Sequence, residues 1–81
     1  MSTTSIPALA QVLFGSPLQA SDRPTPSQIR AAVDAGLRSG DRGYAAQVAQ
    51  EAGDHPEAYA ARMRWALAAV EEAYQPVLLA A

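Results

Sequence analysis

The residue best suited to chemistry is His55, the single histidine of the chain. Glu51 and Glu57 flank it, and a histidine beside carboxylates can form an acid–base pair or hold a metal ion. Gly53 and Pro56 interrupt this segment, so the three side chains do not share one helical face at ligand spacing. A zinc site needs three or four ligands, and the chain has no cysteine to add to its one histidine. We therefore expect no metal and no other cofactor, and we place His55 at a helix cap or on the surface.

No other group of residues forms a catalytic arrangement in the sequence. The serines have no base placed beside them, so a nucleophilic triad cannot be built. The five glycines are spread singly along the chain, which leaves no glycine-rich loop for a phosphate group. The adjacent Glu71 and Glu72 are expected to be a solvated pair. The sequence therefore predicts a protein without enzymatic activity.

The composition predicts one small domain. A chain of 81 residues buries only about 60% of its unfolded surface, so its stability must come from well-packed helices or from dimerisation. All six basic residues are arginine and alanine is the commonest residue, as in the GC-rich coding of actinobacteria. The net charge of −2 speaks against a basic surface that holds nucleic acid. Without a long apolar run or a signal-peptide start, the expected location is cytoplasmic.

Helix signals predict an all-α bundle in which a long C-terminal helix is the central element. Ser5 can cap a first helix, and Thr25, Pro26 and Gln28 form a capping box with proline in the first turn. Pro76 is expected to end the last helix. The third and fourth helices are expected in a helix-turn-helix-like arrangement. The predicted helices are Ile6–Phe14, Pro26–Ser39, Arg42–Ala52 and Pro56–Tyr74.

These helices predict three parts of one domain. Residues 1–24 would be an N-terminal helix and linker arm, residues 25–76 a helical core, and residues 77–81 an apolar tail. The first helix would either cover the core with Leu9, Leu13 and Phe14 or swing free as a docking arm. The predicted core residues are Ile29, Val33, Leu37, Tyr44, Val48, Tyr59, Met63, Leu67, Val70 and Tyr74.

The fourth helix carries a second apolar strip beside its core stripe. At about 100° per residue, Trp65 lies away from the main stripe and shares this strip with small residues. Small residues around a large aromatic side chain let another helix approach closely, and tryptophan is enriched at binding hot spots. Either the N-terminal helix covers Trp65, or Trp65 anchors an interface between proteins. The predicted interface residues are Trp65, Ala58, Ala61, Arg62 and Ala69.

The segment from Val48 to Tyr59 resembles the helix-turn-helix of bacterial regulators. Ala49 stands at the small position of the first helix, Gly53 at the turn, and Tyr59 at the buried position six residues later. Alanine lets two helices approach closely, and glycine tolerates the left-handed turn. The resemblance implies a DNA-binding regulator in which His55 and Arg64 contact DNA.

Two functions from different classes follow from these observations. The first is a non-catalytic interaction or regulatory accessory module that binds protein and self-associates through the surface around Trp65. The second is a helix-turn-helix transcription regulator. The net charge of −2 favours the first. Nothing in the sequence indicates a membrane or a small-molecule substrate as a partner.

Overall fold

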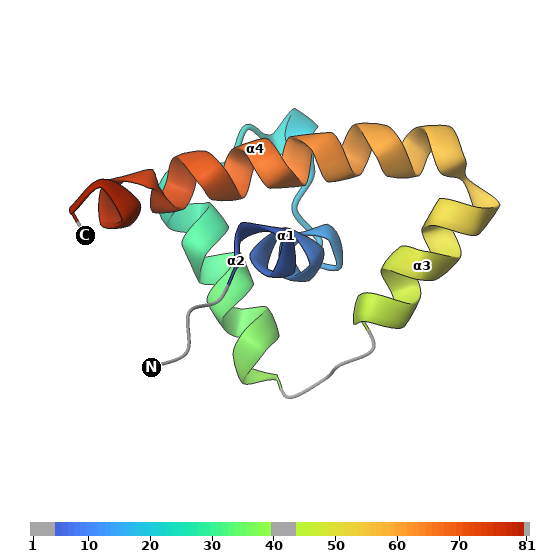
Figure 1. The fold of residues 1–81 in the computed structure, drawn as a ribbon, viewed down its shortest axis with the longest axis horizontal. Coiled ribbons are helices and arrows are strands. Elements are labelled where there is room, and N and C mark those ends of the chain that lie inside the picture. The colour runs from blue at the N-terminus through green and yellow to red at the C-terminus, as the bar shows by residue number, and fades with distance from the viewer. Residues whose placement is uncertain (1–4, 40–43, 81) are drawn as a thin grey trace.

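The computed structural model describes residues 5–39 and 44–80, with side chains for residues 5–39 and 45–74. This part of the chain contains helices and no strand, which confirms the all-α prediction (Figure 1). Over the same residues no helix combines the length and the apolar character that crossing a membrane requires. The elements are α1 (Ile6–Phe14), a 3₁₀ turn η1 (Ala20–Asp22), α2 (Pro26–Arg38), α3 (Tyr44–Asp54) and α4 (Pro56–Ala80).

The first two long helices begin at the capping residues that the sequence predicts. The Ser5 hydroxyl accepts a hydrogen bond from the Ala8 N–H at 3.2 Å, which satisfies a free donor of the first turn of α1. The Thr25 hydroxyl accepts from the Gln28 N–H at 3.2 Å, and the Gln28 side chain accepts from the Thr25 N–H at 2.8 Å. This reciprocal capping box confirms the predicted start of α2.

Helix α1 lies at the centre of the molecule. Figure 1 looks nearly along its axis, with α4 crossing it and with α2 and α3 on either side. It contacts all three other helices, whereas α2 and α3 do not pack against each other over the described residues. Its buried side chains are Leu9, Ala10, Val12, Leu13 and Phe14. The first helix therefore packs on the core with Leu9, Leu13 and Phe14, the first of the two predicted alternatives, and does not swing free. The long helix α4 also contacts the other three helices, as predicted for the central element.

The other helices complete the core with few large side chains. Phe14 meets the half-buried Tyr59 of α4 with ring centres 5.8 Å apart. The remaining buried side chains are Ile29, Val33, Val48, Ala66, Val70 and Ala73. Of the other predicted core residues, Met63, Leu67 and Tyr74 are half-buried. The side chain of Tyr44 lies outside the described residues.

Leu37 is a correction to the predicted core, because 47% of it is exposed. Ile29, Val33 and Leu37 are spaced four residues apart, and each step of four turns about 40° further around a helix. Ile29 and Val33 are still buried, but Leu37 has rotated off the buried stripe. The residue that faces α1 at this level is Gly36, whose position leaves no room for a Cβ beside Val12.

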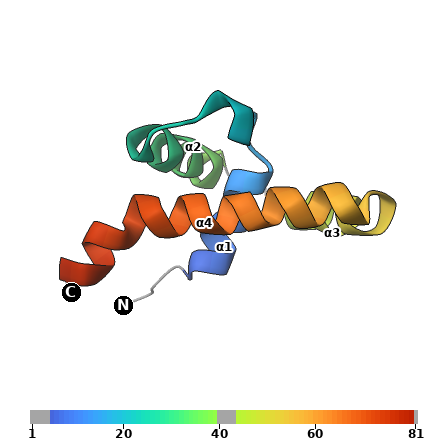
Figure 2. The same ribbon diagram turned by 90° about the horizontal axis from the view of Figure 1, so that it is seen from above.

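Three predicted helix ends are also wrong. Helix α2 ends at Arg38, and Ser39 is its C-cap and not its last residue. Helix α4 continues through Pro76 to Ala80, so the predicted apolar tail of residues 77–81 is helical as far as residue 80. Figure 2 shows α4 changing direction in its last turns, the effect expected of a proline inside a helix. Helix α3 ends at Asp54 and not at Ala52. Its predicted start at Arg42 lies outside the described residues.

Candidate functional site

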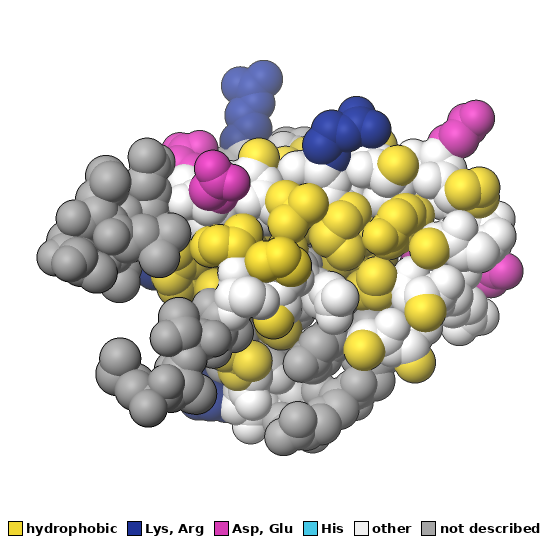
Figure 3. All heavy atoms as spheres, in the orientation of Figure 1, with side chains coloured by type: hydrophobic (Ala, Val, Ile, Leu, Met, Phe, Trp, Pro, Cys, Tyr) yellow, Lys and Arg dark blue, Asp and Glu magenta, His cyan; other side chains and the backbone are white. Residues whose placement is uncertain are grey.

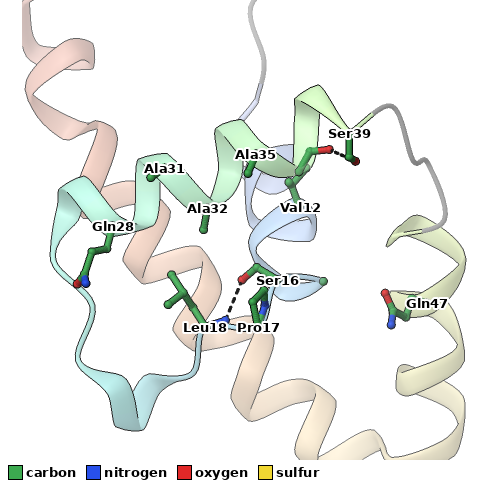
Figure 4. Close-up of a pocket in the computed structure, with 12 residues that line it drawn as sticks. Val12, Ser16, Pro17, Leu18, Gln28, Ala31, Ala32, Ala35, Ser39 and Gln47 are labelled. Atoms are coloured by element: carbon green, nitrogen blue, oxygen red, sulfur yellow. Dashed lines mark hydrogen bonds between the residues drawn. The ribbon is translucent and has the colours of Figure 1, made fainter.

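A groove of about 560 Å³ opens where α2 and α3 diverge around the end of α1. A groove of this size lies in the range of sites that bind ligands or peptide segments. Figure 4 shows Ala32 of α2 and Leu18 of the turn after α1 on facing sides of the groove. Gln47 projects from α3 across the open space (Figure 4). The lining residues are Val12, Gly15, Ser16, Pro17, Leu18, Gln28, Ala31, Ala32, Ala35, Gly36, Ser39 and Gln47.

One whole side of α2 forms the long wall of this groove. The lining residues on that side are small or uncharged; Arg30 and Asp34 lie on other sides of the helix, and Arg38 lies at the border next to Ala31 without lining the groove. Arg38 and Asp34 form an exposed ion pair at 3.1 Å. A Cβ added at Gly36 would lie 2.5 Å from Cγ1 of Val12, so glycine is what lets α2 approach α1 at the base of the groove. The groove therefore has no ionisable side chain among its described lining residues.

The opposite wall is the turn after α1, formed by Ser16, Pro17 and Leu18. The Ser16 hydroxyl donates to the Leu13 carbonyl at 2.7 Å and accepts from the Leu18 N–H at 3.3 Å. The Leu13 carbonyl also accepts the Ser16 N–H at 2.9 Å, so Ser16 joins the end of α1 to the turn through both its backbone and its side chain. Together with the Leu18 N–H bond to the Ser16 hydroxyl, these bonds to Leu13 fix the conformation of the turn that forms this wall of the groove.

Arg62 of α4 ties this turn to the rest of the fold. Its Nη2 donates to the carbonyl oxygens of Phe14, Ser16 and Leu18 at 2.9, 3.0 and 2.9 Å, and its Nε donates to Phe14 at 3.2 Å. A cation at the carboxyl end of a helix also interacts favourably with the helix dipole. Partial burial lowers the pKa of the Arg62 guanidinium from its ordinary value, because desolvation penalises its charge. Arg62 thus acts as a cap for α1 supplied by a distant helix.

Trp65 lies beside Arg62 and is half-buried by its own chain. The guanidinium carbon of Arg62 lies 5.3 Å from the Trp65 ring centre and 5.2 Å from that of Phe14. Both distances fit cation–π contacts. Trp65 also lines a small hollow of about 190 Å³ together with Pro24 of the linker and Pro26, the first residue of α2. The indole therefore already has neighbours within the chain.

The predicted interface residues have different surroundings in the structure. Ala58 and Ala61 are exposed, while Ala69 and Trp65 are half-buried and pack against the core. Arg62 was predicted to lie at the edge of an interface, but it bonds inward to the turn after α1. The structure thus brings Arg62 and Trp65 together and accounts for both within one chain.

The residues predicted to contact DNA are exposed. His55 is the single residue between α3 and α4, and its carbonyl oxygen accepts the Tyr59 N–H at 2.8 Å. Arg64 lies further along α4 and is also exposed. Asp54 and Glu57, which carry negative charge, are exposed on either side of His55.

Sequence reasoning missed the groove and the role of Arg62. One signal for the groove was present, because the positions of α2 on the side of Gln28, Ala32 and Ala35 carry no charge. No local signal marks Arg62, since its acceptors lie 44 to 48 residues earlier in the chain.

Over the described residues, no group of three or more acidic, histidine or cysteine side chains is placed to hold a metal ion. Comparisons with protein-family models, with curated proteins and with solved structures found no match for this chain.

Proposed function

We propose that this protein is a non-catalytic interaction module that takes an apolar helical segment of another protein into the groove between α2 and the turn after α1. The observation that carries the proposal is a groove of about 560 Å³ between α2 and the turn after α1, whose described lining residues carry no charge. Amphipathic helices bind proteins by laying their apolar face into such grooves.

The lining limits what the occupant can be. Ala31 and Ala35 have short side chains, so the backbone of a partner helix can approach α2 closely. A charged group buried here would lose its water and find no opposite charge among the described lining residues, which is costly. Gln28 and Gln47 offer amides at two edges of the groove. The expected occupant is therefore a helix with an uncharged, apolar face and a few polar groups at its margins.

A matched pair of variants tests this proposal. Ala35 lines the groove on α2, and Ala61 lies on α4 on the Trp65 side; both are exposed alanines within helices. The wild-type chain, Ala35→Glu and Ala61→Glu are each immobilised, and the proteins retained from a native lysate are compared. We expect a protein retained by the wild-type chain and by Ala61→Glu but lost with Ala35→Glu. Loss with Ala61→Glu alone would move the binding surface to Trp65, and no retained protein would contradict the proposal.

A DNA-reading role for the start of α4 is the second proposal. It is supported by the exposure of His55 and Arg64, which such a role requires. The neighbouring Asp54 and Glu57 weaken it, because negative charge repels phosphate. Salt-dependent binding to duplex DNA that weakens with Arg64→Ala would favour this role over the groove.

A further inference from the structure

Helix α4 carries an apolar seam on the flank that faces away from Trp65. Ala60, Leu67 and Tyr74 recur every seven residues along this seam, and all are half-buried; Leu67 and Tyr74 pack against the core on one side and remain partly exposed. Met63, also half-buried, lies between the seam and the buried Ala66 and Val70. Figure 3 shows hydrophobic side chains gathered in a continuous band along α4, with acidic and basic side chains on the helix just above them.

Two charged residues border this seam on its outer side. Arg64 and Glu71 are exposed and seven residues apart, so they lie on one line along the helix. Neither has an opposite charge three or four residues away on α4, where a helix would bring one within reach. Within the part of the chain that the structure describes, neither makes an ion pair.

We propose that two copies of this chain associate through antiparallel α4 helices, with Arg64 of each copy paired to Glu71 of the other. Measured along the helix axis, the midpoint between these two residues falls between Leu67 and Ala68, at the level of the seam residue Leu67. A two-fold axis at that point places Leu67 beside Leu67 of the second copy. It also brings both Arg64–Glu71 pairs onto the same outer edge, so the surface is complementary to itself.

The charges also decide the orientation of the two helices. In a parallel pair of helices, the side of the seam that carries Arg64 and Glu71 on one copy would face the opposite, inner side of the seam on the other copy. The inner edge of this seam is formed by Ala66 and Ala73, which are buried. Arg64 and Glu71 would then have no opposite charge to meet. Only the antiparallel arrangement uses both residues.

This association surface is separate from the groove. None of the seam residues lines the groove on α2, so a dimer leaves the groove open. The association is therefore tested on the purified chain alone, and its failure would not bear on the binding of another protein.

A charge-exchange series measured by sedimentation equilibrium tests the proposal. We expect a dimer in the wild-type chain. Arg64→Glu and Glu71→Arg should each raise its dissociation constant by about tenfold or more, because each creates two like-charge pairs. The double variant with both changes should return the constant to within about threefold of the wild-type value. These residues are exposed, so the helical fold, checked by circular dichroism, should be unchanged.

Ala35→Glu, an exposed position on the groove side of α2, is the control and should leave the dimer unchanged. A chain that stays monomeric at millimolar concentration would overturn the proposal. So would a dimer in which the double variant fails to restore association, or one that is broken by Ala35→Glu and not by the charge exchanges.

Discussion

Replacing Arg62 by alanine removes the group that joins α4 to the turn after α1. The substitution deletes hydrogen bonds of 2.9 to 3.2 Å to the carbonyl oxygens of Phe14, Ser16 and Leu18. It also deletes the contacts of the guanidinium with the rings of Phe14 and Trp65. The carbonyl oxygens at the end of α1 would then depend on water for their partners.

The expected loss in the free energy of unfolding can be estimated from these contacts. A hydrogen bond to a charged group contributes about 1.5–3 kcal/mol, but here one guanidinium is shared among three oxygens and is only half-buried. We take about 2 kcal/mol for the hydrogen bonds together and about 1 kcal/mol for the two ring contacts. A loss of about 3 kcal/mol should lower the melting temperature of a domain of this size by about 12–24 °C.

Thermal and urea unfolding followed by circular dichroism at 222 nm measure this loss. Arg38→Ala is the matched control, because the exposed Arg38–Asp34 pair should contribute only tenths of a kcal/mol. Arg62→Lys keeps the charge but cannot spread its donors over three oxygens, so it should recover less than half of the loss. An Arg62→Ala variant within about 0.5 kcal/mol of the wild type would refute the capping role.

Three further substitutions test other parts of the fold. Gly36→Ala should destabilise by about 1–2 kcal/mol despite its better helix propensity, because its Cβ would meet Val12, and adding Val12→Ala should relieve the clash. Thr25→Ala should cost about 1 kcal/mol in urea unfolding by removing the cap of α2; a neutral result would contradict that cap. Burial raises the pKa of Tyr74, aided by Asp34 and opposed by Arg30, so the folded chain holds this proton more tightly than the unfolded chain. Its contribution to stability should be complete below about pH 10 and fall as pH rises beyond it, and Tyr74→Phe should remove that part of the pH dependence.

Features encoded by neighbouring residues could be predicted from the sequence. Ser5 and Thr25 are caps whose partners lie three residues away, so both helix starts were predicted correctly. The burial of Val33 and Val70 also follows from helical spacing.

Features that depend on distant parts of the chain could not be predicted in this way. Leu37 has the right spacing for the core, but which side of α2 is covered depends on where α1 packs. In the sequence Arg62 looks like any surface arginine, because its hydrogen-bond acceptor Phe14 lies far away along the chain. The groove exists only because α2 and α3 diverge around α1, and no local pattern encodes that divergence.

The central position of α1 has a consequence for biosynthesis. Helix α1 is complete at Phe14, but α4 begins only at Pro56, and Val70, one of its fully buried residues, comes later still. At about 5–20 residues per second, a ribosome needs several seconds to make the chain between them. During that time the most apolar helix of the protein exists without the surface that will enclose it. The nascent chain is therefore a ready target for chaperones until its last helix emerges.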